Sequence, residues 1–272
     1  MRAAARASPA PPRRKRFGQH FLHDPAVTER ILAALAPRAG EHLVEIGPGR
    51  GALTRRLLAL KDVSFDAIEI DRDLAAALAP QFPGAPGPAL HVADALTFDF
   101  AALARERGGA LRLIGNLPYN ISTPLLFHLL GQRGALTDLT FMLQREVVTR
   151  LAAAPGGKDY GRLTVMLAPY CSVRRQFDVG PGAFQPPPKV WSAVVRLSVR
   201  AVPLFAVSPH YPRVVAAAFS QRRKTLRNAL AALLSREQIS ACGVDPAARP
   251  ETLAPQDFNI LAQALDRAHP SG

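Results

Sequence analysis

The sequence predicts an α/β protein, in which a doubly wound, Rossmann-like sheet precedes a small, all-helical C-terminal domain. Short apolar runs alternate with segments of helical periodicity up to about residue 200, which is typical of βαβ units. A glycine-rich turn over residues 47–51 follows the first apolar run, and the pattern after Pro203 is helical. Because ligands bind at the carboxyl ends of parallel strands, the informative residues should directly follow strands.

The expected elements follow in chain order. Helical periodicity predicts helices over 25–36, 52–60, 72–79 and 123–130. Apolar runs predict strands over 42–46, 63–70, 90–94, 111–116, 139–143 and 189–199. The C-terminal helices are expected near 212–220, 225–234 and 255–268. We therefore expect a basic disordered tail over 1–16, an α/β domain over 17–200 and a helical domain over 201–272.

The charge balance predicts a polyanionic partner. The 272 residues include 34 Lys and Arg against 21 Asp and Glu, a formal net charge of +13, which favours nucleic acid over an anionic membrane. Cys171 and Cys242 lie far apart, so neither a zinc site nor a disulfide framework is expected. No apolar run approaches the ~20 residues that span a bilayer, and the N-terminal stretch lacks the apolar core of a secretory signal. We expect a cytoplasmic protein that binds neither metal nor membrane.

The turn after the first strand reads Glu45-Ile46-Gly47-Pro48-Gly49-Arg50-Gly51. Its glycines let the backbone turn tightly and approach a ligand with no Cβ in the way. A nicotinamide enzyme would show G-x-G-x-x-G around a pyrophosphate. The spacing G-x-G-x-G after an acidic residue is more typical of S-adenosylmethionine sites, although this loop alone leaves a purely structural turn open.

Acidic residues end the next two strands. Glu69 lies about 20 residues beyond Gly47, the separation at which a carboxylate accepts hydrogen bonds from ribose hydroxyls. The alternative for Glu69 is an acid favoured by a helix dipole. Asp94 ends the third strand, where its carboxylate can accept from the amine of an adenine. Two acids at successive strand ends favour a cofactor that contains a nucleoside.

The most specific motif is Gly115-Asn116-Leu117-Pro118-Tyr119-Asn120, directly after an apolar strand. It resembles the N-[LP]-P-[YF] motif of amino-methyltransferases. The lone pair of an exocyclic amine is delocalised into the ring, so acceptors aimed at both N–H bonds must push the nitrogen toward tetrahedral geometry. The Asn116 side-chain oxygen and the Leu117 carbonyl can supply them, with Pro118 fixing the turn. Tyr119 would stack on the flipped-out base, an interaction worth about 1–3 kcal/mol. The alternative is a structural turn with a buried tyrosine.

The whole chain resembles the ribosomal RNA adenine N6,N6-dimethyltransferases, most closely their bacterial small-subunit (16S) branch. The resemblance covers residues 15–22, 45–51, 68–71, 115–124, 141–146, 160–163, 184–190 and 219–226. It implies a methyltransferase sheet with a helical domain, S-adenosylmethionine as cofactor, and dimethylation of two adjacent adenosines. The partner it implies is small-subunit rRNA in a pre-ribosomal particle, and we expect a monomer.

The resemblance also implies roles for single residues. His20 stands where the family commonly carries asparagine, and its imidazole can donate to the cofactor carboxylate unless it only enters a helix. Phe184 would sandwich the target base against Tyr119, or else only pack. The candidate catalytic residues are Asn116, Leu117, Tyr119 and Phe184, and the candidate cofactor-binding residues are His20, Leu22, Gly47, Glu69, Asp94 and Asn116.

Four other functions are compatible with parts of the sequence. A DNA adenine methyltransferase shares the Asn-x-Pro-aromatic chemistry, but the chain has no sizeable insert for reading a base sequence. A large-subunit rRNA methyltransferase shares all the motifs, and only the stretch 219–226 favours the small-subunit branch. A non-catalytic assembly factor would leave Asn116 and Tyr119 without a purpose, and the glycine spacing disfavours a nicotinamide oxidoreductase. Four of the seven residues over 221–227 are basic, which predicts that the helical domain docks the RNA.

Overall fold

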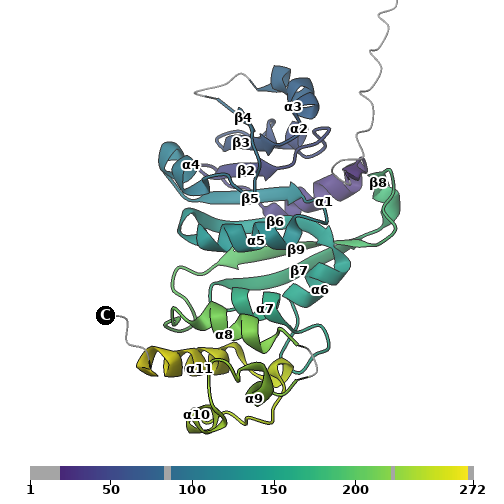
Figure 1. Ribbon diagram of the computed structural model, residues 1–272. Helices are drawn as coiled ribbons and strands as arrows, with labels where there is room; N and C mark the ends of the chain where they lie inside the picture. Colours follow the sequence, from purple (N-terminus) through teal and green to yellow (C-terminus); the bar gives the residue numbers. More distant parts are fainter. Residues whose placement is uncertain (1–18, 83–86, 222–223, 269–272) are drawn as a thin grey trace, which may run out of the picture.

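A seven-stranded sheet forms the centre of the computed structural model, which describes residues 19–82, 87–221 and 224–268 (Figure 1). The strand order is β4-β3-β2-β5-β6-β9-β7. The strands are β2 (His42–Ile46), β3 (Ser64–Glu69), β4 (Ala89–Val92), β5 (Leu111–Asn116), β6 (Leu136–Gln144), β7 (Cys171–Val179) and β9 (Ser192–Val199). The five strands from β4 to β6 run parallel, whereas β9 is antiparallel to both β6 and β7. The Rossmann-like fold class is confirmed.

Helices cover both faces of this sheet. The helices before and between the parallel strands are α1 (Pro25–Leu35), α2 (Thr54–Leu57), α3 (Arg72–Leu78), α4 (Phe100–Arg107) and α5 (Ser122–Gly131), and α6 (Arg145–Leu151) follows the last of these strands. On one face, Ile31 of α1 packs in one apolar cluster with Leu43 of the sheet. On the other face, Leu125 of α5 packs in a second cluster with Leu113. The sheet therefore presents only its edges and strand ends to solvent.

Local sequence explains where α1 begins and ends. The Asp24 carboxylate accepts from the backbone N–H groups of Ala26 and Val27, and Pro25 occupies the first turn, where its missing N–H costs nothing. The helix ends at Ala36, which is left-handed at φ 46° and donates its N–H to Leu32. The helix is thereby fixed directly ahead of β2 and the glycine loop.

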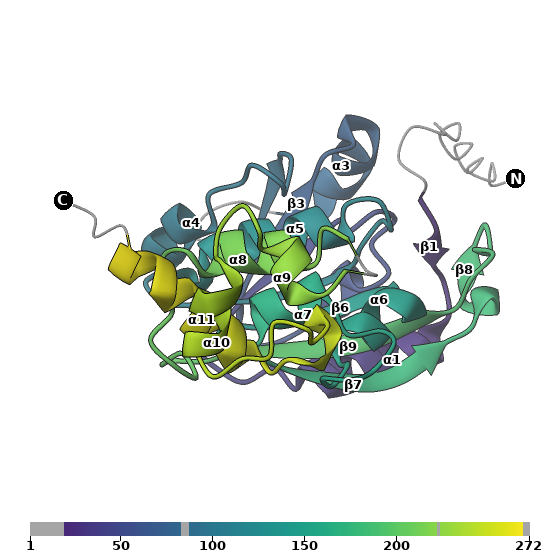
Figure 2. The same cartoon turned by 60° about the horizontal axis from the view of Figure 1, so that its bottom comes forward.

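A separate two-stranded sheet joins β1 (Phe21–Leu22) to β8 (Phe184–Gln185). The pairing is antiparallel and places Leu22 opposite Phe184. Figure 2 shows the two strands side by side, away from the C-terminal helices. This pairing holds the segment before α1 against the Pro-rich loop that precedes β9.

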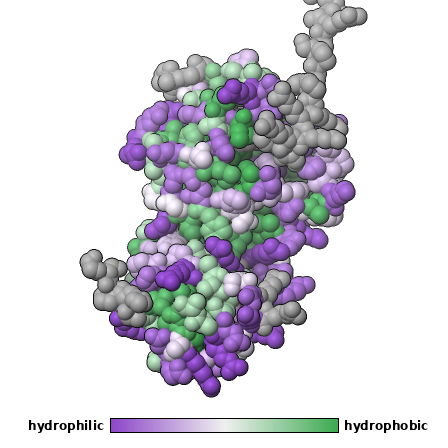
Figure 3. Space-filling view, viewed as in Figure 1, coloured by the Kyte–Doolittle hydropathy of each residue, from purple (hydrophilic) through white to green (hydrophobic). Residues whose placement is uncertain are grey.

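The C-terminal helices gather beyond β7 (Figure 1). They are α8 (Tyr211–Ala218), α9 (Leu226–Ala229), α10 (Arg236–Ala241) and α11 (Pro255–Ala268), preceded in the chain by α7 (Arg162–Leu167). Val165 and Met166 of α7 pack in the same apolar cluster as these helices, and the Tyr211 hydroxyl donates to the Val165 carbonyl at 2.9 Å. The domain boundary expected at residue 201 stays a prediction. Helix α7 precedes that boundary in the chain but packs with the C-terminal helices. Figure 3 shows the outline of the molecule narrowing between the sheet and these helices.

The structure differs from the expected elements at several points. The last strand begins at Ser192 rather than residue 189, and the helix expected over 225–234 is regular only from Leu226 to Ala229. The sequence patterns predicted no element at β7, α4, α6 or α7. The expected tail over 1–16 and the basic residues Arg222 and Arg223 lie outside the described residues. No helix among the described residues is long and apolar enough to cross a membrane.

Candidate active site

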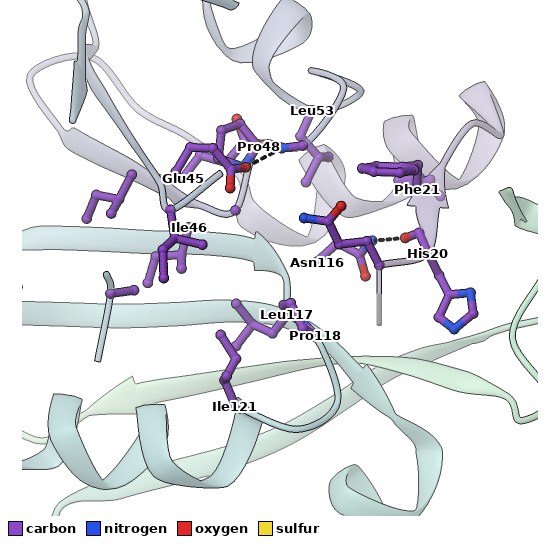
Figure 4. Close-up of a pocket in the computed structure, with 18 of the residues that line it drawn as sticks. His20, Phe21, Glu45, Ile46, Pro48, Leu53, Asn116, Leu117, Pro118 and Ile121 are labelled. Atoms are coloured by element: carbon purple, nitrogen blue, oxygen red, sulfur yellow. Dashed lines mark hydrogen bonds between the residues drawn. The ribbon is translucent and has the colours of Figure 1, made fainter. Parts of the chain in front are cut away.

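A cavity of about 380 Å³ opens at the carboxyl ends of β2, β3 and β5. Its walls are the glycine loop, the segment after β3, the segment after β5 and the N-terminal stretch that includes β1 (Figure 4). The predicted residues that line it are His20, Leu22, Gly47, Glu69, Asp94, Asn116, Leu117 and Tyr119. Phe184 is the predicted site residue that does not line it.

The glycine loop has the conformation that its sequence requires. Gly47 and Gly49 are left-handed, at φ 68° and φ 56°, where other residues are strained. A Cβ at Gly49 would lie 3.1 Å from the ring of Phe21, whereas a Cβ at Gly47 would meet nothing within 4 Å. The loop is therefore packed under Phe21 on one side. At Gly47 it leaves backbone next to open space, where a ligand can approach.

Glu69 joins the glycine loop to the end of β3. Its carboxylate accepts from the N–H of Gly49 at 3.0 Å and from the N–H of Asp71 at 2.9 Å. Burial raises the pKa of Glu69, although both hydrogen bonds oppose that shift. Each carboxylate oxygen keeps a second lone pair, so the group can still accept from two hydroxyls. Asp94, half-buried, accepts from the N–H of Leu96 at 2.9 Å.

Glu45, which is not among the predicted site residues, also lines the cavity. Its side chain is only 2% exposed, and it accepts a hydrogen bond from the Thr54 hydroxyl at 2.6 Å. Burial raises the pKa of Glu45 to about 8. Its place directly before the glycine loop was the only signal in the sequence, and the pattern could not show how deeply the carboxyl is buried.

Asn116 is oriented by the N-terminal segment. Its side-chain nitrogen donates to the backbone carbonyl of His20 at 3.0 Å (Figure 4). A carbonyl can only accept, so this bond identifies which end of the amide is the nitrogen. Among the described residues, no hydrogen-bond donor contacts the Asn116 side-chain oxygen or the Leu117 carbonyl. Two acceptors are thus left open at the end of β5.

Tyr119 and His20 form the adjoining wall. The Tyr119 hydroxyl lies 3.1 Å from the Ser192 hydroxyl, and its ring centroid lies 5.8 Å from that of His20. His20 Nδ1 lies 2.7 Å from the Pro186 carbonyl, so Nδ1 carries a proton. A neutral imidazole then has no second N–H to donate. Binding of a cofactor carboxylate by the His20 ring therefore requires the protonated ring.

Phe184 is buried away from the cavity. Its side chain is 3% exposed and packs in the apolar cluster that contains Leu22 and Val27. Its use as a stacking partner for a base stays a prediction. Among the described residues, no group of three or more His, Cys, Asp and Glu side chains is placed to hold a metal ion.

A protein-family model described as ribosomal RNA adenine dimethylase matches residues 12–267. The chain belongs to this family. A protein of Nitrosococcus oceani named ribosomal RNA small subunit methyltransferase A is 58% identical to this dimethylase over 252 residues, which cover 92% of this chain and 95% of the relative. A protein of the same name from Pseudomonas aeruginosa is 54% identical, covering 93% of this chain and 94% of the relative.

Solved structures agree with the fold. The fold of the dimethylase matches a dimethyladenosine transferase from Plasmodium falciparum with a TM-score of 0.76 at 23% identity, covering 91% of this chain and 98% of that chain. It also matches the 23S rRNA methyltransferase ErmE with a TM-score of 0.68 at 28% identity, covering 90% of this chain and 99% of that chain. The family predicted from the sequence is confirmed, and the protein is an rRNA methyltransferase.

Proposed function

We propose that this dimethylase transfers methyl groups from S-adenosylmethionine to the exocyclic N6 of two adjacent adenosines in small-subunit (16S) rRNA. The observation that carries this proposal is the pair of open acceptors, the Asn116 side-chain oxygen and the Leu117 carbonyl, at one wall of the cavity. An amine with two N–H bonds is the group that such a pair recognises. The protein acts as a monomer in the cytoplasm, on a pre-ribosomal particle and without a metal ion.

The cavity fits the cofactor in size and in chemistry. Its volume of about 380 Å³ lies within the range of small-molecule sites. Glu69 would accept from the ribose hydroxyls and Asp94 from the adenine amine, while the open backbone at Gly47 lets the cofactor lie close. When bound, S-adenosylmethionine supplies a methyl group on a sulfonium, which an amine can attack. Asn116 would contact both the cofactor and the target amine.

The residues at the end of β5 prepare the nucleophile. The Asn116 oxygen and the Leu117 carbonyl would accept from the two N–H bonds of N6 and pull the nitrogen out of conjugation. No general base is needed before attack, because the amine becomes acidic as its new bond forms and releases its proton afterwards. The rate therefore depends on proximity and in-line orientation, to which the hydrogen bond from the Asn116 amide to the His20 carbonyl contributes.

Tyr119 would hold the flipped-out base. Its hydroxyl is fixed by Ser192, so the ring is oriented before RNA binds. Stacking on this ring offsets part of the cost of unstacking the adenosine. Phe184 would close the other side of the base if β8 moves toward the cavity.

The charge of the chain and its relatives favour small-subunit RNA as the substrate. The net charge of +13 suits a polyanion. Relatives named as small-subunit methyltransferases are 50–58% identical, compared with 28% for the large-subunit methyltransferase ErmE. The C-terminal domain predicted from the sequence, which includes the basic stretch 221–227, would bind the RNA while the sheet holds the site.

Methyl transfer to three acceptors tests this proposal. Purified protein would be incubated with labelled S-adenosylmethionine and, in parallel, with immature small ribosomal subunits, large subunits and duplex DNA. We expect label in 16S rRNA alone. Label mainly in 23S rRNA or in DNA would replace the proposed substrate, and absence of label from all three would contradict the proposed activity.

A further inference from the structure

Trp191 is the single tryptophan of the chain, and 48% of its surface is exposed. It immediately precedes β9, which begins on the same side of the sheet as β8 and α6 (Figure 1). The residue lies outside the cavity of the active site. An exposed aromatic ring at the margin of the proposed nucleic-acid site is free to stack on a base.

The strand register places Trp191 next to the residue that would hold the target base. Ser192, its neighbour in the chain, lies within hydrogen-bond distance of the Tyr119 hydroxyl. Ser192 also pairs with Gln144 at the carboxyl end of β6. Trp191 is therefore at the same end of the strands as the active site. It is one residue from the contact that orients Tyr119.

The indole ring is supported but not covered. A Cβ at Gly180 would lie 3.6 Å from the ring, so the backbone of this glycine packs near it. The Arg145 guanidinium lies 5.7 Å from the ring centroid, whereas Arg30 lies 3.9 Å from the ring of Phe177 in a closed contact. The larger separation leaves part of the ring open to a third group.

Arg145 completes a surface with two kinds of recognition chemistry. Its backbone N–H donates to the Trp191 carbonyl at 2.9 Å, which fixes the two residues relative to each other. Its side chain is exposed, and the neighbouring Glu146 is already paired with Arg150. Within the described part of the chain, no carboxylate pairs with the Arg145 guanidinium. An exposed aromatic ring next to such a guanidinium suits a nucleotide, because a base stacks on the ring and the guanidinium binds the phosphate.

We propose that Trp191 stacks on the nucleotide next to the target adenosine and that Arg145 binds its phosphate. The inference rests on the proposed function, because it assumes an RNA with one base flipped into the cavity. Flipping removes a stacking partner from the neighbouring base. The exposed indole replaces that partner and holds the unpaired strand in the conformation that methyl transfer needs.

The first test is kinetic. Trp191→Ala should raise the KM for immature small subunits at least about five-fold, the change equal to ~1 kcal/mol, with unchanged affinity for S-adenosylmethionine. Trp191→Phe should restore most of the loss, because a phenyl ring still stacks. Val202→Ala is the matched control, since Val202 is also apolar, is 77% exposed and lies beyond the opposite end of β9. It should leave the KM unchanged.

The second test uses Trp191 as its own probe. Single-stranded oligoadenylate, added without any ribosomal protein, should quench the tryptophan fluorescence of the wild type. Duplex RNA of the same length should quench it much less. A KM for Trp191→Ala within two-fold of the wild type, or equal quenching by both RNAs, overturns the inference. If the wild type fails to methylate small subunits, the proposed function fails instead. The oligoadenylate titration then decides whether Trp191 binds single-stranded RNA.

Discussion

The side-chain amide of Asn116 donates to the backbone carbonyl of His20, with 3.0 Å between nitrogen and oxygen. The bond joins two segments that lie 96 residues apart in the chain. It orients the amide so that its oxygen, rather than its nitrogen, remains available to a substrate amine. The N-terminal segment therefore contributes to the chemistry through its backbone, whichever side chain stands at position 20.

Asn116→Ala should lower the rate of methyl transfer by about 100-fold or more, because it removes an acceptor that matters most as the nitrogen becomes tetrahedral. Affinity for the cofactor should change far less. Asn116→Asp is the matched variant: it keeps an oxygen but cannot donate to the His20 carbonyl. Its rate should lie between those of the other two proteins. Single-turnover kinetics and calorimetry measure these effects, and near-normal turnover of Asn116→Ala would reject the role of this residue.

Glu69→Ala should weaken the binding of S-adenosylmethionine and of its demethylated product by a similar factor, roughly 10-fold or more. Contacts to the ribose do not change during methyl transfer, so the KM for the cofactor rises while kcat is mostly kept. Glu69→Gln should lose less, because an amide oxygen can still accept from the Gly49 N–H. A fall in kcat at unchanged cofactor affinity would place Glu69 outside the ribose site.

The raised pKa of the buried Glu45 carboxyl should make the stability of the protein depend on pH. Its pKa in the folded protein is about 8, above its ordinary value of 4.5, so the folded state holds the proton more tightly. Its contribution to stability is complete below pH 4.5 and is lost as the pH rises toward 8. Glu45→Gln cannot ionise and should escape this loss.

Thermal unfolding at pH 5 and pH 8 measures the effect. The difference in Tm between Glu45→Gln and the wild type should be higher at pH 8 than at pH 5 by at least about 2 °C. A change of ~1 kcal/mol in the free energy of unfolding gives a shift of that size in a protein of this length. Glu106→Gln serves as the control because its carboxylate is 65% exposed. The same difference at both pH values would mean that Glu45 is ionised in the folded protein.

Charge reversal in the basic stretch 221–227 tests which part of the chain binds RNA. Lys224→Glu with Arg227→Glu should weaken binding to small subunits and flatten its dependence on salt, since phosphate contacts release counterions. Both side chains are exposed. Cofactor affinity should stay constant. Salt slopes that remain parallel to the wild type would shift the RNA-binding role to the basic N-terminal residues 13–16.

Strands buried on both faces could be predicted from the sequence. The bounds of β2 and β5 match the expected ranges because these apolar runs have helices on both sides. By contrast, β6 starts three residues earlier than expected, since Asp138 interrupts its apolar run. That carboxylate is buried only because Arg112 and Arg196, from the two neighbouring strands, pair with it. Pairing across a sheet cannot be inferred from one strand's own pattern.

The edge strand β7 was missed for a related reason. Arg174 and Arg175 are exposed there, and a register shift between Arg175 and Phe177 breaks the alternation of apolar and polar residues. In the site, motif spacing was sufficient to bring Gly47, Glu69 and Asn116 to one cavity. It could not show that the Asn116 amide is held by a backbone carbonyl from the N-terminal segment.

Nucleoside mass analysis of 16S rRNA tests the central claim most directly. Immature small subunits would be incubated with S-adenosylmethionine and either the wild type or Asn116→Ala, and the 16S rRNA would then be digested to nucleosides. We predict N6,N6-dimethyladenosine with the wild type and almost none with the variant. Methyl groups on another base or on the ribose, or equal yields of dimethyladenosine from both proteins, would contradict the account.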